Sequence, residues 1–181
     1  MGRLDGKVAV ITGAGSGIAR AAAKIFTREG AQVVVAELNP ELGAAAALEA
    51  GNNAIFVQTD VTDEASAEAV MQQAVEHFGG LHILFNCAGG SVLEDSKVTD
   101  VDMDVWERTI PLDLKGPFLC SRFGIPHIIA SGGGAVVNVS SVVALRGNHP
   151  AHVYSSAKGG LISLTRSLAG SYSDEGVRAN V

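Results

Sequence analysis

The sequence contains little cysteine and no long apolar run, and each shortage excludes a class of protein. Only two of its 181 residues are cysteines, Cys87 and Cys120, so a disulfide framework is excluded and both thiols are expected to be reduced and buried. No uninterrupted apolar stretch approaches the roughly 18 to 20 residues that span a bilayer, and Met1–Lys7 does not have the form of a cleavable signal. We therefore expect a cytoplasmic protein without a membrane partner.

Positive charge is also scarce. The chain has 13 Lys and Arg against 19 Asp and Glu, which gives a formal net charge of −6. It lacks a cluster of basic residues, and affinity for nucleic acid requires that many phosphates be neutralised, so nucleic acid is excluded as a partner. Charged residues make up only 18% of the chain and hydrophobic residues 47%, a balance that excludes a predominantly disordered protein.

What the sequence does contain is a regular alternation of short apolar runs and longer amphipathic stretches, punctuated by 22 glycines. The apolar runs lack period-2 alternation and are rich in Val, Ile and Ala, as in strands buried on both faces. The predicted strands are Val8–Ile11, Val33–Ala36, Ile55–Val57, Ile83–Phe85 and Ala135–Val139, and the predicted helices are Ile18–Arg28, Pro40–Ala50, Asp63–Phe78, Trp106–Ala130, with a break at Pro111 or Pro117, and Tyr154–Tyr172. This order predicts a doubly wound parallel sheet in a three-layer α/β/α arrangement, forming one domain over residues 1–181.

A polar or glycine residue closes each predicted strand, and ligands of open parallel sheets bind outside these carboxyl ends. The first strand ends in a glycine-rich turn that opens the next helix. Glycine permits positive φ and lets the backbone approach a pyrophosphate, while free N–H groups at the helix start attract its charge. The turn therefore predicts a dinucleotide cradle, with an ordinary tight turn as the alternative. The residues of this cradle are Thr12, Gly13, Gly15, Ser16, Gly17 and Ile18.

Glu37 closes the second predicted strand, 20 residues after the last glycine of this turn. A carboxylate there can accept hydrogen bonds from both ribose hydroxyls of adenosine and would repel a 2′-phosphate. Ser16 offers no cation to bind such a phosphate, although Arg20 lies nearby, so NAD is favoured over NADP. Standing alone, Glu37 would instead be a solvated strand-end carboxylate. Asp60 and Val61 are expected to flank the adenine, with a helix-capping turn as the alternative.

Tyr154 and Lys158 stand four residues apart and hence lie on one face of a predicted helix. Free tyrosine titrates near a pH of about 10, so it is a poor base at neutral pH unless a neighbouring cation, here Lys158, stabilises the phenolate. Ser141, at the end of the fifth predicted strand, would hold the substrate oxygen while Tyr154 exchanges the hydroxyl proton and hydride passes to or from a nicotinamide. The alternative is a core tyrosine, a surface lysine and a strand-end serine.

Together these motifs resemble the classical short-chain dehydrogenase/reductase family over essentially the whole chain. The matching segments, in chain order, are the turn 12–19, Asp60, the stretch 86–89, the stretch 138–141, and Tyr154 with Lys158. The resemblance implies a Rossmann-like fold, a nicotinamide cofactor and Ser141, Tyr154 and Lys158 as the catalytic trio, with Lys158 also bonding the nicotinamide ribose. The residues implied to contact the cofactor after the fourth strand are Asn86, Ala88 and Gly89. It also implies a homodimer or homotetramer, with the helices around 106–130 and 154–172 in the interface.

Two positions depart from the family pattern. Ala19 replaces the last glycine of the turn, which a slightly displaced helix can accept. Asp113 stands where the family usually carries a catalytic asparagine that helps hold a water in a proton relay. An ionised aspartate accepts hydrogen bonds but cannot donate one, and its charge would sit near Lys158. The proton relay is therefore in question, whereas the hydride chemistry is not. Asn138 is expected to satisfy backbone groups at its strand end.

The sequence thus predicts an oxidoreductase that moves hydride between a nicotinamide cofactor, preferably NAD, and a small secondary alcohol or ketone. Two alternatives remain: a nucleotide-binding scaffold or regulator that has lost the reaction, supported by Asp113, and an NADPH-dependent reductase of 3-oxoacyl thioesters, weakened by Glu37. No metal site is expected, because His149 and His152 have no acidic or thiol partner close in sequence. The segment 176–181 is predicted to begin a sixth strand. We expect these residues to be part of a longer protein and to lack its C-terminal strand and substrate loop.

Overall fold

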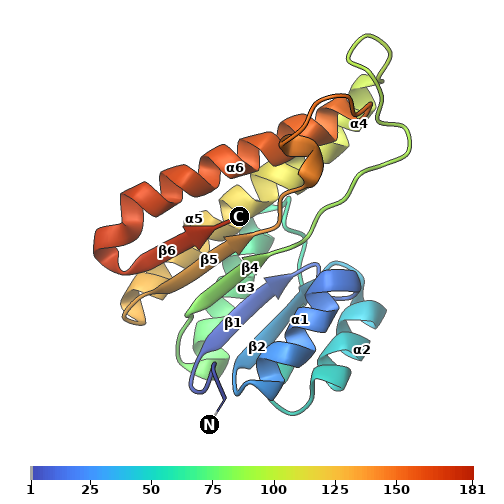
Figure 1. Cartoon of the computed structure of the whole chain (residues 1–181). Coiled ribbons are helices and arrows are strands. Elements are labelled where there is room, and N and C mark those ends of the chain that lie inside the picture. Colours follow the sequence, from blue (N-terminus) through green and yellow to red (C-terminus); the bar gives the residue numbers. More distant parts are fainter. Residues whose placement is uncertain (1) are drawn as a thin grey trace.

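The apolar runs form one parallel sheet in the computed structural model, which describes residues 2–181 (Figure 1). The strands are β1 (Val8–Thr12), β2 (Gln32–Glu37), β3 (Ala54–Gln58), β4 (Ile83–Asn86), β5 (Gly134–Asn138) and β6 (Val177–Asn180). Their order is β3-β2-β1-β4-β5-β6, and every neighbouring pair is parallel. The predicted Rossmann-like sheet is confirmed, and the segment after residue 176 is indeed a strand, which pairs with β5.

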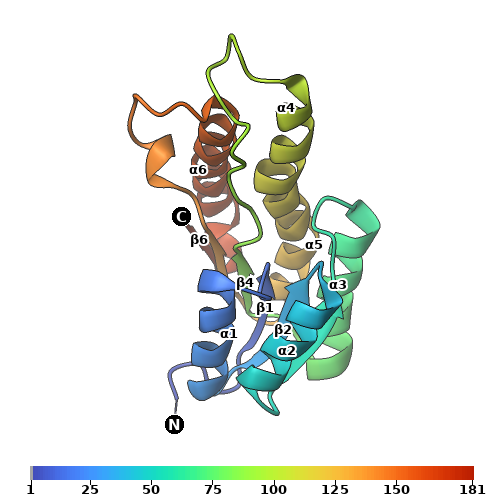
Figure 2. The ribbon, with the colours of Figure 1, turned by 90° about the vertical axis from the view of Figure 1, so that its right-hand side faces the viewer.

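Helices cover both faces of this sheet. They are α1 (Gly17–Arg28), α2 (Pro40–Ala50), α3 (Glu64–Phe78), α4 (Met103–Ile110), α5 (Gly116–Ala130) and α6 (His152–Tyr172), with short helices η1 (Pro111–Lys115), η2 (Val142–Ala144) and η3 (Ser173–Glu175). Figure 2 shows the sheet between α1 on one side and α3 with α5 on the other, which is the predicted three-layer arrangement. Within residues 2–181, no helix combines the length and the apolar character that a membrane crossing requires.

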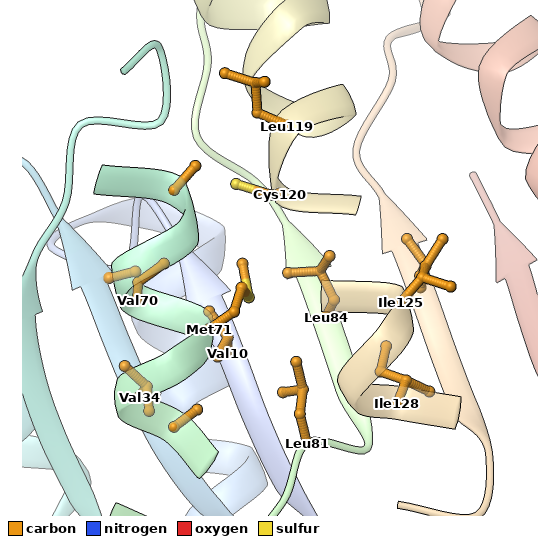
Figure 3. Packing of buried hydrophobic residues seen from close by; sticks show 14 of the residues in the cluster. Val10, Val34, Val70, Met71, Leu81, Leu84, Leu119, Cys120, Ile125 and Ile128 are labelled. Carbon is orange, nitrogen blue, oxygen red and sulfur yellow. The ribbon is translucent and has the colours of Figure 1, made fainter. Parts of the chain in front are cut away.

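The core lies on both faces of the central strands, as their uninterrupted apolar sequences predict. All five residues of β1 are buried. On one face, Val10 and Leu84 pack against the helical residues Met71 and Ile128, which point from α3 and α5 toward the sheet (Figure 3). On the other face, α1 and α2 present mainly alanines, which allow these helices to lie close to the strands. The sheet is thereby a rigid base for the loops at its carboxyl edge.

The long helix predicted over 106–130 begins three residues earlier and changes form at one of its two predicted break points. The chain remains helical through Pro111, but residues 111–115 make a π-helical turn instead of a regular α-helical one. Proline has no N–H for the regular ladder, and such turns are often found at functional sites. This turn places Asp113 in the interior, where the residue is fully buried.

His82 connects the start of β1 to the start of β4. Its Nδ1 atom accepts a hydrogen bond of 3.1 Å from the Val8 backbone N–H. Desolvation lowers the pKa of His82, and the nearby positive charge of Lys7 lowers it further. The unfolded chain therefore takes up this proton at a higher pH than the folded chain does, so the stability that His82 contributes is present above pH ~6.5 and is lost as the pH falls through the folded pKa.

We expect the free energy of unfolding to fall between pH 7.5 and 5 in the native protein, and to fall less steeply in His82→Asn. The asparagine oxygen can accept the same hydrogen bond, worth about 1 kcal/mol, without titrating. Urea unfolding at several pH values measures this slope. His127→Asn, at a second histidine near the same edge of the sheet, is the matched control and should keep the native slope. Equal slopes in the native protein and His82→Asn would contradict the assignment.

Candidate active site

A crevice of about 600 Å³ lies at the carboxyl edge of the sheet, where the ends of β1, β2, β4 and β5 meet the first turns of α1 and α6. This volume is in the usual range for sites that hold a cofactor. The predicted site residues that line the crevice are Gly13, Ser16, Gly17, Ile18, Glu37, Asp60, Val61, Ala88, Gly89, Tyr154 and Lys158. The predicted convergence of the strand ends is therefore present in the fold.

Other predicted cofactor residues lie behind the wall of the crevice and hold it in place. Thr12 is buried, and its Oγ1 accepts hydrogen bonds of 3.1 and 3.2 Å from the backbone N–H groups of Cys87 and Ala88. Asn86 is also buried, and its amide donates to the Asn138 side chain over 2.8 Å. Thr12 thus joins the end of β1 to the loop after β4.

The glycine turn packs closely against the loop after β4 and leaves the start of α1 open. Gly13 has φ +68°, and a Cβ at this position would lie 2.7 Å from the Ala88 Cα atom. Gly17 has φ +53° at the first position of α1, and no atom of residues 2–181 lies within 4 Å of where its Cβ would be. The Ser16 side chain makes no capping hydrogen bond to α1 within this part of the chain. The first N–H groups of α1 are therefore open to an anionic ligand.

Glu37 lies directly against this turn. One carboxylate oxygen accepts the Gly15 N–H over 2.9 Å and the other accepts the Asn39 N–H over 3.0 Å. Arg20, the nearby cation, is engaged elsewhere: its guanidinium is paired with Glu49 and donates to the Gly15 carbonyl. The charge that faces the crevice beside the turn is consequently negative.

Asp60 follows β3 at the entrance to α3. Its carboxylate accepts hydrogen bonds from the Thr62 N–H and hydroxyl, at 2.9 and 2.7 Å, and its own N–H donates to the Ser66 hydroxyl. These contacts form the turn that was the alternative interpretation of this residue. Asp60 and the buried Val61 nevertheless both line the crevice, so the turn and the predicted adenine contact are compatible.

Tyr154 and Lys158 lie one helical turn apart on the face of α6 that borders the crevice. The Lys158 ammonium is 5.6 Å from the centre of the Tyr154 ring. It donates to the Val139 carbonyl over 3.0 Å, and the Lys158 residue is only 3% exposed. Ser141 is the N-cap residue of the short helix η2, and its hydroxyl accepts the Val143 N–H at 3.4 Å.

Asp113 completes this arrangement with a buried ion pair. Its Oδ1 atom lies 2.9 Å from the Lys158 ammonium and accepts the Gly90 N–H over 3.0 Å. Within residues 2–181, the buried Oδ2 atom has no hydrogen-bond partner. Burial raises the pKa of Asp113, while the Lys158 ammonium and the Gly90 N–H lower it by less. The adjacent Gly89 has φ +149°, and a Cβ there would lie 2.3 Å from Asp113 Oδ1, so only glycine fits.

Comparison with known proteins identifies the family to which the chain belongs. Residues 7–181 match the family described as short chain dehydrogenase. The chain belongs to this family. It is therefore an oxidoreductase of the short-chain dehydrogenase type, and the resemblance drawn from its motifs is confirmed.

Individual relatives share about two fifths of their aligned residues with this short-chain dehydrogenase. It is 40% identical to a cis-4-hydroxycyclohexanecarboxylate dehydrogenase of Sinomonas cyclohexanicum, over 96% of this chain and 70% of the relative. It is 41% identical to a meso-2,3-butanediol dehydrogenase of Serratia marcescens, over 98% and 70%. An uncharacterized oxidoreductase of Thermotoga maritima is 39% identical, over 97% and 69%. The chain thus spans about 70% of the length of these relatives.

The expectation for Asn138 in this short-chain dehydrogenase was wrong. Asn138 does not serve backbone groups with its side chain: it accepts from the Asn86 amide and donates to the Thr165 hydroxyl, both over 2.8 Å. The three side chains are buried and join β4, β5 and α6. A buried polar side chain satisfies its hydrogen bonds with whatever group the fold brings near, and here the neighbours are other side chains. The network fixes α6 against the sheet.

The two thiols differ in their surroundings. Both cysteines are free. Cys120 is fully buried in α5, and burial raises its pKa to about 12. Cys87 is half-buried and lines the crevice, although it was expected to be a buried apolar residue. Burial also raises the pKa of Cys87, which keeps this thiol protonated at neutral pH.

Sequence reasoning missed two kinds of site residue. The first kind lines the crevice beside predicted residues, and its members are Leu38, Thr59, Cys87, Leu112 and Val139. Most of these neighbour a predicted strand end, so widening each predicted position by one residue would have found them. The second kind is Asp95, which is 7% exposed and contacts the start of α6. Its partners are almost sixty residues away in sequence, and no local pattern marks it.

Proposed function

We propose that this short-chain dehydrogenase transfers hydride between NAD and a small secondary alcohol or its ketone, using Ser141, Tyr154 and Lys158. The observation that carries the proposal is the placement of Tyr154 and the buried Lys158 on the same crevice wall, beside a glycine turn with open helix N–H groups. The names of two relatives, which are dehydrogenases of hydroxy compounds, support the same class of substrate.

The residues of the crevice fit a nicotinamide dinucleotide. The turn at Gly13 and Gly17 would hold its pyrophosphate, and Glu37 would accept the hydroxyls of its adenosine ribose. Asp60 and Val61 would flank its adenine, while Lys158 would bond the second ribose. When bound, the nicotinamide ring supplies the acceptor or donor of hydride. The binding site would be completed by Thr12, Gly15, Ser16, Ile18, Asn86, Ala88 and Gly89.

Tyr154 would exchange the substrate proton. In alcohol oxidation its phenolate takes the hydroxyl proton, and in ketone reduction its hydroxyl returns one. A phenolate needs a nearby positive charge at neutral pH, and the Lys158 ammonium lies 5.6 Å from the ring. The Val139 carbonyl and Asp113 hold that ammonium in place. Ser141 would hold the substrate oxygen in line with the phenol.

The test is a steady-state assay of secondary alcohols with NAD and of ketones with NADH. Turnover of any member of the panel supports the proposal. A second candidate function is a nucleotide-binding scaffold, which the Lys158–Asp113 ion pair favours because it neutralises the ammonium that the reaction needs. Cofactor binding without turnover across the panel would support this second function. Turnover of a 3-oxoacyl thioester with NADPH would instead support the third alternative.

The cofactor preference follows from the charge around the glycine turn. Because Glu37 faces the crevice and Arg20 is paired with Glu49, we expect NAD to raise Tm by roughly 5 to 10 °C at a hundredfold excess over Kd, and NADP to raise it much less. In Glu37→Gln the rise in Tm caused by NAD and the rise caused by NADP should differ less than in the native protein. Glu41→Gln, an exposed carboxylate at the start of α2, should leave it unchanged. A larger shift with NADP would overturn the preference.

The protein is also proposed to form a homodimer or homotetramer through the region of α4, α5 and α6. Two large side chains on these helices are partly exposed, Trp106 at 41% and Phe118 at 48%. Burial of such apolar area against a second copy is a common driving force for association.

A further inference from the structure

A buried carboxylate outside the proposed catalytic trio touches the backbone of the proposed catalytic tyrosine. Asp95 lies in the loop between β4 and α4, which passes beside the start of α6 (Figure 1). One of its oxygens accepts the Val153 N–H over 3.2 Å, and the other accepts the Tyr154 N–H over 2.7 Å. Asp95 is 7% exposed, so its charge is largely shielded from water.

The start of α6 has no residue of its own that caps its first N–H groups with a side chain. Its N-cap residue is Ala151, which carries no side-chain acceptor, and the first turn holds no acidic residue. The first N–H groups of a helix lack partners within the helix, and the partial positive charge there favours a carboxylate. Asp95 therefore provides, from a distant loop, the side-chain acceptor that a serine, threonine, aspartate or asparagine at the N-cap position commonly provides.

Two further hydrogen bonds join the same segments. The His152 N–H donates to the Ser96 carbonyl over 3.2 Å, and the Val98 N–H donates to His152 Nδ1 over 3.0 Å. Together with the two bonds of Asp95, they form a clamp between residues 95–98 and residues 152–154. The same loop is also held at Gly90, whose N–H donates to Asp113. The loop is thus fixed at two places to groups that surround Lys158 and Tyr154.

We propose that Asp95 is a positioning residue for the reaction: its carboxylate fixes the first turn of α6 and thereby the place of the Tyr154 phenol relative to Lys158. The inference rests on the proposed role of Tyr154. Lys158 is held independently, one turn later, by Val139 and Asp113. Loss of the clamp would therefore move the phenol with respect to the ammonium, and a shift of about 1 Å can cost on the order of 100-fold in rate.

The test compares Asp95→Ala and Asp95→Asn with Asp102→Ala, using butan-2-ol with NAD as the probe. Asp102 is the matched control, because its carboxylate also caps a helix by accepting the Asp104 N–H, but that helix is α4. We expect Asp95→Ala to lower kcat by about 10- to 100-fold, with KM and NADH affinity within about twofold of the native values. Asp95→Asn keeps one hydrogen-bond acceptor, so its kcat should lie between those of the native protein and Asp95→Ala. Asp102→Ala should retain kcat within about twofold.

Hydrogen exchange of the Val153 and Tyr154 amides provides a second readout that needs no turnover. Protection of these amides should be lost in Asp95→Ala and kept in Asp102→Ala. Native kcat in Asp95→Ala, an equal loss of kcat in Asp102→Ala, or unchanged protection would each overturn the proposal. If the native protein binds NAD but oxidises no secondary alcohol of the panel, the proposed function fails on its own, and the exchange measurement alone decides whether Asp95 holds the start of α6.

Discussion

Replacing Tyr154 by phenylalanine is expected to lower kcat for alcohol oxidation by about 10² to 10⁴-fold, the range that a positioned general acid or base supplies. The substitution removes only the phenolic oxygen, so the ring still fills its place on α6 above Lys158. NAD affinity should stay close to the native value, because the glycine turn and Glu37 make most of the proposed cofactor contacts. Steady-state kinetics and a fluorescence titration with NADH measure the two quantities separately.

The chain contains a matched control for this experiment. Its only other tyrosine, Tyr172, ends the same helix far from the crevice. Tyr172→Phe should therefore keep kcat within about twofold, since it removes the same atom from the same helix without touching the site. Full turnover in Tyr154→Phe, or an equal loss in Tyr172→Phe, would rule out the assigned proton exchange.

The second large effect is expected at Asp113. Its ionised carboxylate lies 2.9 Å from the Lys158 ammonium and opposes the stabilisation that this ammonium gives to a phenolate at Tyr154. Asp113→Asn removes the charge and keeps an oxygen that can accept from Lys158. At an effective dielectric constant of about 20, a nearby unit charge contributes on the order of 1 to 2 kcal/mol, and solvent reduces this contribution further. We expect the acid limb of the kcat/KM profile to move to lower pH by about one unit.

The same substitution has a predicted signature in stability. Burial raises the pKa of Asp113 above its unfolded value of 3.8, so its contribution to stability is fully present below that value and is lost as the pH rises through the folded pKa. Asparagine does not titrate. The free energy of unfolding of Asp113→Asn, compared with that of the native protein, should therefore rise as the pH increases across this window. Asp104→Asn, at an exposed position on α4, is the control for loss of one charge. An unmoved acid limb would contradict the role given to the ion pair.

The sequence correctly predicted those features whose geometry depends on residues that lie close together along the chain. Continuous Val and Ile runs predicted the buried strands, because a parallel sheet covered on both faces requires apolar side chains in both directions. The glycine turn and the Tyr154–Lys158 pair were found for the same reason: their geometry is set by a spacing of a few residues along one element. The order of strands then brought their ends together, as the topology of such sheets dictates.

What the sequence could not predict depends on contacts between distant segments. The π-helical turn at residues 111–115 could be foreseen only as a break, because proline indicates a disturbed ladder but not its new form. The partners of Asn138 are 52 and 27 residues away, and those of Asp95 are 58 and 59 residues away. Such polar groups are satisfied by whatever the fold places beside them, so their roles became readable only in three dimensions.

Direct hydride transfer can be tested by following a single atom. Butan-2-ol carrying deuterium on its hydroxyl-bearing carbon is incubated with the protein and NAD, and the NADH formed is analysed by mass spectrometry. In the proposed reaction hydride would pass directly from the substrate carbon to the nicotinamide in the crevice bordered by Tyr154 and Lys158, so we expect NADH that carries the deuterium. NADH without deuterium would rule out direct hydride transfer, and the absence of NADH from a protein that binds NAD and oxidises none of the secondary alcohols would rule out the proposed reaction.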